Sequence, residues 1–122
     1  MAEPKAPFAY EGLDRVFHER ARLGIVTSLA GHADGLGFSE LKALCGLTDG
    51  NLARHLQVLA EAGFVEQHKD VEGRRAVTRC RLTDEGRARF ADYLSALEDV
   101  LRQASRSRTR DASPGALRTR PA

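Results

Sequence analysis

The sequence predicts an α+β fold that is mostly helical, with a two- or three-stranded β segment before a long last helix. Apolar residues recur at helical spacing as far as residue 62, and the period then shortens to two over residues 64–82. A seven-residue apolar repeat begins at Phe90. Because the chain has 122 residues, one domain with a modest core accommodates all of these elements.

The predicted domain spans residues 13–105, between two segments that lack apolar periodicity. Residues 1–12 include two prolines and are expected to form a flexible N-terminal arm. Residues 106–122 carry five arginines and one acid, and we expect a disordered basic tail there. The remaining residues, 1–105, hold 14 basic and 16 acidic side chains, so any binding of nucleic acid must depend on local basic patches.

The most informative stretch is residues 47–64, which predicts one amphipathic helix. Thr48 is suited to cap its start, and Gly63 is suited to end it. Leu52, Leu56 and Leu59 form an apolar stripe at helical spacing. The polar residues of the first turn and of another face can hydrogen-bond to DNA bases or phosphates. The candidate DNA contacts of this helix are Thr48, Asp49, Gly50, Asn51, Arg54 and Gln57.

A short helix is predicted directly before this one, with Ser39 as its cap and Gly46 as its end. Leu41 and Leu44 are expected to face inward. Two helices joined by a tight turn that contains glycine form a helix-turn-helix, whose second helix enters the DNA major groove. An earlier helix is expected to begin near Leu13, with a break or kink within residues 18–22.

After Gly63 the pattern predicts a β hairpin, with strands at residues 64–69 and 76–82 and a loop at residues 70–74. Gly73 supplies the positive backbone angle that such a loop needs. Arginines at a hairpin tip are well placed for phosphates or a minor groove. The candidate DNA contacts of the hairpin are Lys69, Arg74, Arg75 and Arg79. The order of elements is that of a winged helix, with the hairpin as the wing.

The last predicted helix begins after Thr83, and its apolar residues follow steps of four and three. A body this small cannot cover the whole repeat, so we expect this helix to pair with a second copy. A two-fold dimer requires a roughly palindromic DNA site. The predicted dimerisation residues are Phe90, Tyr93, Leu94, Leu97, Val100 and Leu101.

Three motifs together resemble the small winged-helix transcriptional regulators related to the MarR and ArsR groups. The first runs from Leu13 to His18 and resumes at Arg22. The second runs from Leu47 to Val65, and the third is Leu82-Thr83-x-x-Gly86-Arg87. The resemblance implies a cytoplasmic homodimer that binds operator DNA, often as a repressor.

Enzymatic, metal-binding and membrane roles find no support in the sequence. Cys45 and Cys80 lack close partners, and the four histidines lack the spacing of metal ligands. We found no catalytic motif, so no catalytic residue, metal or cofactor is predicted. No apolar run is long enough for a membrane span, and the first five residues do not resemble a signal peptide.

The sequence is also compatible with two alternative functions. The acidic body is compatible with a winged-helix module that binds another protein and has lost DNA reading. The two thiols are compatible with a ligand- or redox-responsive sensor of the same fold.

Overall fold

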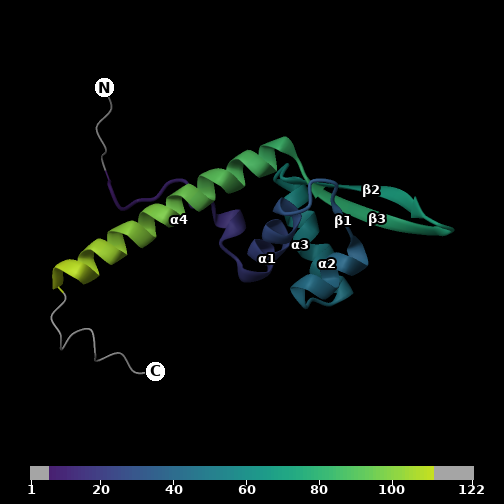
Figure 1. The fold of residues 1–122 in the computed structure, drawn as a ribbon. Helices are drawn as coiled ribbons and strands as arrows, with labels where there is room; N and C mark the ends of the chain where they lie inside the picture. Colours follow the sequence, from purple (N-terminus) through teal and green to yellow (C-terminus); the bar gives the residue numbers. More distant parts are fainter. Residues whose placement is uncertain (1–5, 112–122) are drawn as a thin grey trace.

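The computed structural model describes residues 6–111, with side chains described as far as Arg106. Its elements follow the predicted order: the 3-10 helix η1 (Arg15–Phe17), α1 (Arg20–Ala30), β1 (Leu36–Gly37), α2 (Phe38–Cys45), α3 (Asp49–Glu61), β2 (Val65–Glu72), β3 (Arg75–Leu82) and α4 (Asp84–Asp111). Helices α1, α2 and α3 form the body, and the β2–β3 hairpin and α4 project from it in opposite directions (Figure 1). The predicted winged-helix fold with a long C-terminal helix is confirmed.

The sheet has three antiparallel strands in the order β1-β3-β2. Strand β1 adds only two residues, which pair with Arg79 and Cys80 of β3. Strands β2 and β3 pair continuously from Val65 opposite Leu82 to Glu72 opposite Arg75. The wing loop therefore contains only Gly73 and Arg74, and the longer loop predicted at residues 70–74 is wrong. Gly73 has a φ of +65°, as expected for a tight hairpin turn.

The core is a single cluster to which every helix and all three strands contribute. Its buried residues are Phe17, Ile25, Val26, Leu29, Leu36, Leu41, Leu52, Leu56, Leu59, Phe64, Val65, Cys80, Leu82, Phe90 and Tyr93. Phe17 lies at its aromatic centre, because its ring centroid is 5.2 Å from Phe64 and 5.4 Å from both Phe90 and Tyr93. Helix η1, which contains Phe17, therefore joins α4 to the body.

The first helix differs from the expectation of a helix starting near Leu13. The chain instead forms η1, breaks at His18 and restarts as α1 at Arg20. Asp14 caps η1, and the side chain of Glu19 caps α1 by accepting from the amide of Arg22. Two separate caps therefore account for the break that the sequence indicated within residues 18–22.

Two predictions for α2 were wrong. Its N-cap is Gly37 rather than Ser39, and the Glu40 carboxylate accepts from the Gly37 amide at 2.9 Å. Leu44 was expected to face inward but is 61% exposed, whereas Leu41 is fully buried. The predicted end at Gly46 is confirmed, with a φ of +65°.

Helix α4 begins after Thr83 as predicted and continues to Asp111. It therefore occupies residues 106–111, which were expected to belong to a disordered tail. The rest of that predicted tail, residues 112–122, lies outside the described residues. Within residues 6–111, none of the helices combines the length and the apolar character needed to cross a bilayer.

The predicted N-terminal arm is described only from residue 6, since residues 1–5 lie outside the described part. Residues 6–14 form successive turns, with backbone bonds from Ala9 to Ala6 and from Leu13 to Tyr10. A Cβ added to Gly12 would lie 3.2 Å from the Asp92 carbonyl oxygen. This segment therefore packs closely against α4.

Candidate nucleic-acid interface

Helix α3 is held to the body by one face and leaves the other to solvent. Leu52, Leu56 and Leu59 are fully buried, as the sequence predicted. The Thr48 hydroxyl caps the helix by accepting from the amide of Asn51 at 3.1 Å. Gly63, with a φ of +84°, lets the chain leave α3 for the sheet. This geometry fixes the rotation of α3 and so determines which side chains face outward.

The predicted contacts of α3 are all exposed and lie along its outer face: Thr48, Asp49, Gly50, Asn51, Arg54 and Gln57. Three of these side chains form hydrogen bonds within the helix. Arg54 donates to the Asn51 Oδ1 at 3.4 Å. Gln57 donates to the Glu61 Oε2 at 3.2 Å. Such exposed pairs are weak, so these groups are available to hydrogen-bond with another molecule.

The first turn of α3 also contacts α2 through a residue that the sequence reasoning missed. The Lys42 Nζ lies 2.9 Å from the Asp49 Oδ1. This pair offsets the negative charge at the tip of the helix. A lysine seven residues before the helix start gave no signal of its own, because only the turn at Gly46 brings the two together.

His55 was interpreted as a half-buried residue on the core side, and the structure agrees. Its side chain is 14% exposed, and its Nδ1 lies 3.9 Å from the Glu19 Oε1. Glu19 also accepts from the Arg22 amide, which lowers the pKa of this carboxyl below its usual value. The sequence reasoning missed Glu19, which places a carboxylate beside both the start of α1 and the inner edge of α3.

The wing carries its basic residues in two different states. Lys69, Arg74 and Arg75 are exposed and, among residues 6–106, form no ion pair. Arg79 is half-buried and is paired with the carboxylates of Asp70 and Glu72. Three of the four predicted basic contacts therefore lie exposed on the surface, and the fourth, Arg79, is already paired within the protein.

The comparisons with known proteins agree with this geometry. The model of the winged helix DNA-binding domain matches residues 21–101, which is more than half of the chain. The chain belongs to this winged-helix DNA-binding family. An uncharacterised protein of Methanocaldococcus jannaschii is 39% identical over 80 residues, which cover 66% of this chain and 86% of the relative.

Solved structures of regulators share this winged-helix architecture. A transcriptional regulator homologue from Pyrococcus horikoshii OT3 has a TM-score of 0.73 and 28% identity, covering 81% of this chain and 98% of that chain. A MarR-family regulator from Silicibacter pomeroyi has a TM-score of 0.52 and 21% identity, covering 87% of this chain and 70% of that chain. The chain therefore carries a winged-helix domain of the kind found in transcription regulators.

The two thiols of this winged-helix chain differ in their surroundings. Cys80 is fully buried in the core, and burial raises its pKa to about 11. At neutral pH this thiol stays protonated and is therefore a poor nucleophile. Cys45 is half-buried, and its Sγ lies 3.8 Å from the Ser28 hydroxyl. Among the described residues, no three histidine, cysteine or acidic side chains are grouped as a metal site would need.

Two of the residues predicted for dimerisation on α4 are instead buried in the core of this chain. Phe90 is 5% and Tyr93 is 2% exposed, and both pack on Phe17. Leu94 and Leu101 are 43% and 64% exposed. Leu97 and Val100 are half-buried. The apolar surface that α4 leaves exposed therefore centres on Leu94 and Leu101.

Proposed function

We propose that this protein is a homodimeric, sequence-specific transcription regulator that binds a near-palindromic operator and acts as a repressor. The observation that carries the proposal is the outward polar face of α3. Asn51, Arg54 and Gln57 are exposed along it, while its three leucines are fully buried. Helix α3 enters the major groove, where arginine pairs with guanine and asparagine with adenine.

The wing adds contacts that do not read bases directly. Lys69, Arg74 and Arg75 are exposed without an ion pair among the described side chains, so their charges are available to phosphates or to a narrow minor groove. Each such contact strengthens binding and makes it more dependent on salt.

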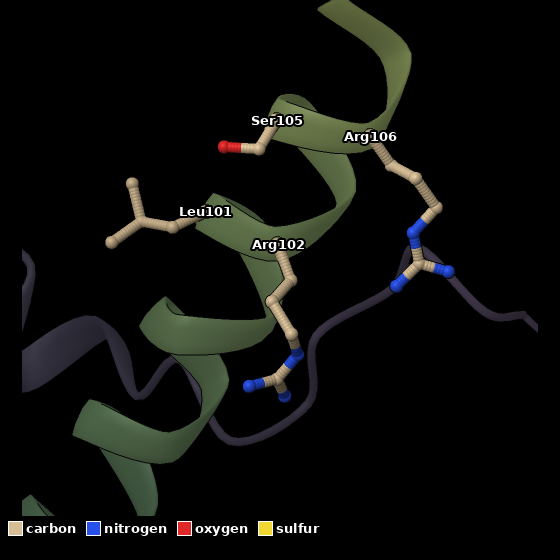
Figure 2. A pocket seen from close by; sticks show the side chains of 4 residues that line it. All are labelled: Leu101, Arg102, Ser105 and Arg106. Atoms are coloured by element: carbon tan, nitrogen blue, oxygen red, sulfur yellow. The ribbon is translucent and has the colours of Figure 1, made fainter. Parts of the chain in front are cut away.

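The long helix α4 supplies the surface for the second copy. Leu101 lies in a shallow depression with Arg102, Ser105 and Arg106, in the part of α4 that extends beyond the body (Figures 1 and 2). Figure 2 shows Leu101 and Ser105 on one side of the helix and the two arginines on the other. A pair of α4 helices would cover the leucine side and leave the arginines in solvent.

Selection of bound duplexes from a random DNA pool tests the proposal. We expect a recovered motif with two inverted half-sites about one helical turn apart. Arg54→Ala is expected to weaken binding to that motif by about 1–3 kcal/mol and to relax the preference at one base pair of each half-site. Arg15→Ala is the matched control, because it removes an exposed arginine from η1, outside α3 and the wing. Recovery of no motif at moderate salt would count against the proposal.

The module that binds another protein is the second candidate, and the net negative charge of residues 1–105 favours it. Charge reversal at the wing separates the two functions. If Arg74→Glu with Arg75→Glu leaves the affinity for DNA unchanged, the wing does not contact DNA and the second candidate gains support.

A further inference from the structure

Arg79 makes more polar contacts than any other basic side chain of the wing hairpin, and all are internal. Its Nη2 lies 2.8 Å from the Glu72 Oε2, and its Nε lies 3.3 Å from the Asp70 Oδ2. Its Nη1 donates to the carbonyl oxygen of Gly35 at 3.4 Å. The guanidinium group thus contacts two carboxylates of β2 and a carbonyl oxygen of the loop before β1.

The strand register explains how one side chain reaches both acids. Arg79 pairs with His68, and Asp70 and Glu72 follow at steps of two along β2. Side chains two residues apart lie on the same face of a strand. Both carboxylates therefore share a face with Arg79 and lie farther out toward Gly73, so the side chain extends along the hairpin toward its tip.

The third contact ties this arrangement to the body. Gly35 has a φ of +91°, and a Cβ there would lie 2.6 Å from the Cys80 carbonyl oxygen. The loop before β1 therefore comes so close to β3 that only glycine fits at position 35 without strain. Its carbonyl lies within reach of Arg79, and the side chain links the loop, the middle of β3 and the outer half of β2.

The electrostatic consequence concerns the outer part of the wing. Residues 69–75 contain Lys69, Arg74 and Arg75 but also Asp70 and Glu72. An unpaired carboxylate at this position would repel DNA phosphates and reduce the effect of the three basic groups. Both acids are exposed, with 49% and 61% of their side chains accessible, and among the described side chains Arg79 is the cation that forms an ion pair with each of them.

We infer that Arg79 is a positioning residue of the wing, which holds Asp70 and Glu72 in ion pairs and leaves Lys69, Arg74 and Arg75 to contact phosphates. The inference rests on the proposed DNA binding, and it reassigns Arg79 from a phosphate ligand to a residue that acts through its neighbours. Arg81 serves as a comparison, because it pairs with the single carboxylate of Glu66, closer to the body.

A double-mutant cycle tests this inference on the full chain, with a labelled DNA duplex of random sequence as the probe. Arg79→Ala alone is expected to weaken binding by roughly fivefold, since two carboxylates lose their partner. In the background Asp70→Asn with Glu72→Gln, the same Arg79→Ala change is expected to alter binding by less than about twofold, because no acid remains to be paired. Arg79→Lys, which retains one charge but lacks the fork, is expected to recover part of the loss.

A purely structural role and a direct phosphate contact predict different results. A direct contact predicts that Arg79→Ala costs the same factor in both backgrounds, and such additivity would overturn the inference. Urea titration shows whether Arg79→Ala loses DNA binding because it unfolds. In that case Arg79→Lys takes its place in the cycle, and its effect on binding is compared between the wild type and the Asp70→Asn, Glu72→Gln background. Arg81→Ala is the matched control and should weaken binding less than Arg79→Ala. Absence of DNA binding by the wild type would overturn the proposed function and this inference together, whereas additive effects would overturn only this inference.

Discussion

At the scale of single residues, the connection between β3 and α4 shows why a glycine occurs in the motif Leu82-Thr83-x-x-Gly86-Arg87. The Thr83 hydroxyl donates to the Gly63 carbonyl at 2.7 Å and accepts from the Gly86 amide at 2.9 Å. The Thr83 amide donates to the Phe64 carbonyl. Gly86 therefore lies against the backbone of Phe64, directly before β2, where a Cβ would be 2.9 Å from the Phe64 Cα.

The change Gly86→Ala is expected to reduce the free energy of unfolding by about 2–4 kcal/mol, because the added methyl group meets backbone atoms that cannot move aside easily. Urea titration followed by circular dichroism measures this loss. Gly50→Ala is the matched control: a Cβ at Gly50 meets no atom within 4 Å, and alanine favours a helix by up to about 1 kcal/mol. Equal destabilisation by the two changes would contradict this explanation.

At the scale of elements, α2 and α3 illustrate two different ways to cap a helix. The Thr48 hydroxyl caps α3 directly. For α2 the cap residue is a glycine, and the Glu40 side chain in the first turn accepts from the Gly37 amide. The sequence pattern predicted the first correctly and misassigned the second, because Ser39 and Gly37 both fit the usual cap preferences.

We expect Thr48→Ala to lower the free energy of unfolding by about 1 kcal/mol through loss of the cap. Ser39→Ala is the matched control and should cost less than about 0.5 kcal/mol, because Ser39 lies inside α2 rather than at its cap. Thermal unfolding of both variants at one pH measures the difference. A larger loss for Ser39→Ala than for Thr48→Ala would contradict the assignment of Gly37 as the cap of α2.

At the scale of the whole molecule, the apolar residues of α4 lie in two different environments. Its first turns carry Phe90 and Tyr93 into the core beside Phe17. His18, directly after η1, adds a hydrogen bond of 3.1 Å between its Nδ1 and the Tyr93 hydroxyl of α4. Leu94, next to Tyr93, is exposed, and so is Leu101, in the part of the helix that extends away from the body (Figure 1). We therefore expect the proposed dimer to form through the exposed part and not through the whole repeat.

The change Leu101→Lys is expected to shift the protein from dimer to monomer, because it places a charge in the proposed apolar contact. Analytical ultracentrifugation over a range of concentrations measures the shift. Leu44→Lys is the matched control, since Leu44 is an exposed leucine on α2 with a similar accessible fraction of 61%. Loss of the dimer in both variants, or in neither, would argue against α4 as the contact.

Much of the fold followed from local patterns in the sequence. The leucines of α3 are buried where helical periodicity placed them, and Gly73 has the positive backbone angle predicted for the hairpin turn. The prediction for Leu44 was wrong, because helical spacing alone assigned it to the apolar stripe of α2. A short helix buries only what its neighbours cover, and no pattern within α2 reports those neighbours.

The candidate site was also predicted only in part from the sequence. The exposed face of α3 followed from the position of its leucines, since one face of a helix determines the other. The contacts of Arg79 did not follow, because its partners Asp70 and Glu72 are seven to nine residues away and Gly35 is 44 residues away. Residue type alone grouped Arg79 with Arg74 and Arg75, although the three side chains have different surroundings.

The sequence by itself determined the order of the elements, the buried stripe of α3 and the basic character of the wing, because these depend on periodicity and residue type. Only the tertiary structure decided which charges are already paired and which apolar residues of α4 remain exposed. Ion pairs and burial depend on distances between segments that lie far apart in the chain. The fold therefore changed the interpretation of Arg79 and Tyr93. It left that of Leu52, Leu56 and Leu59 unchanged.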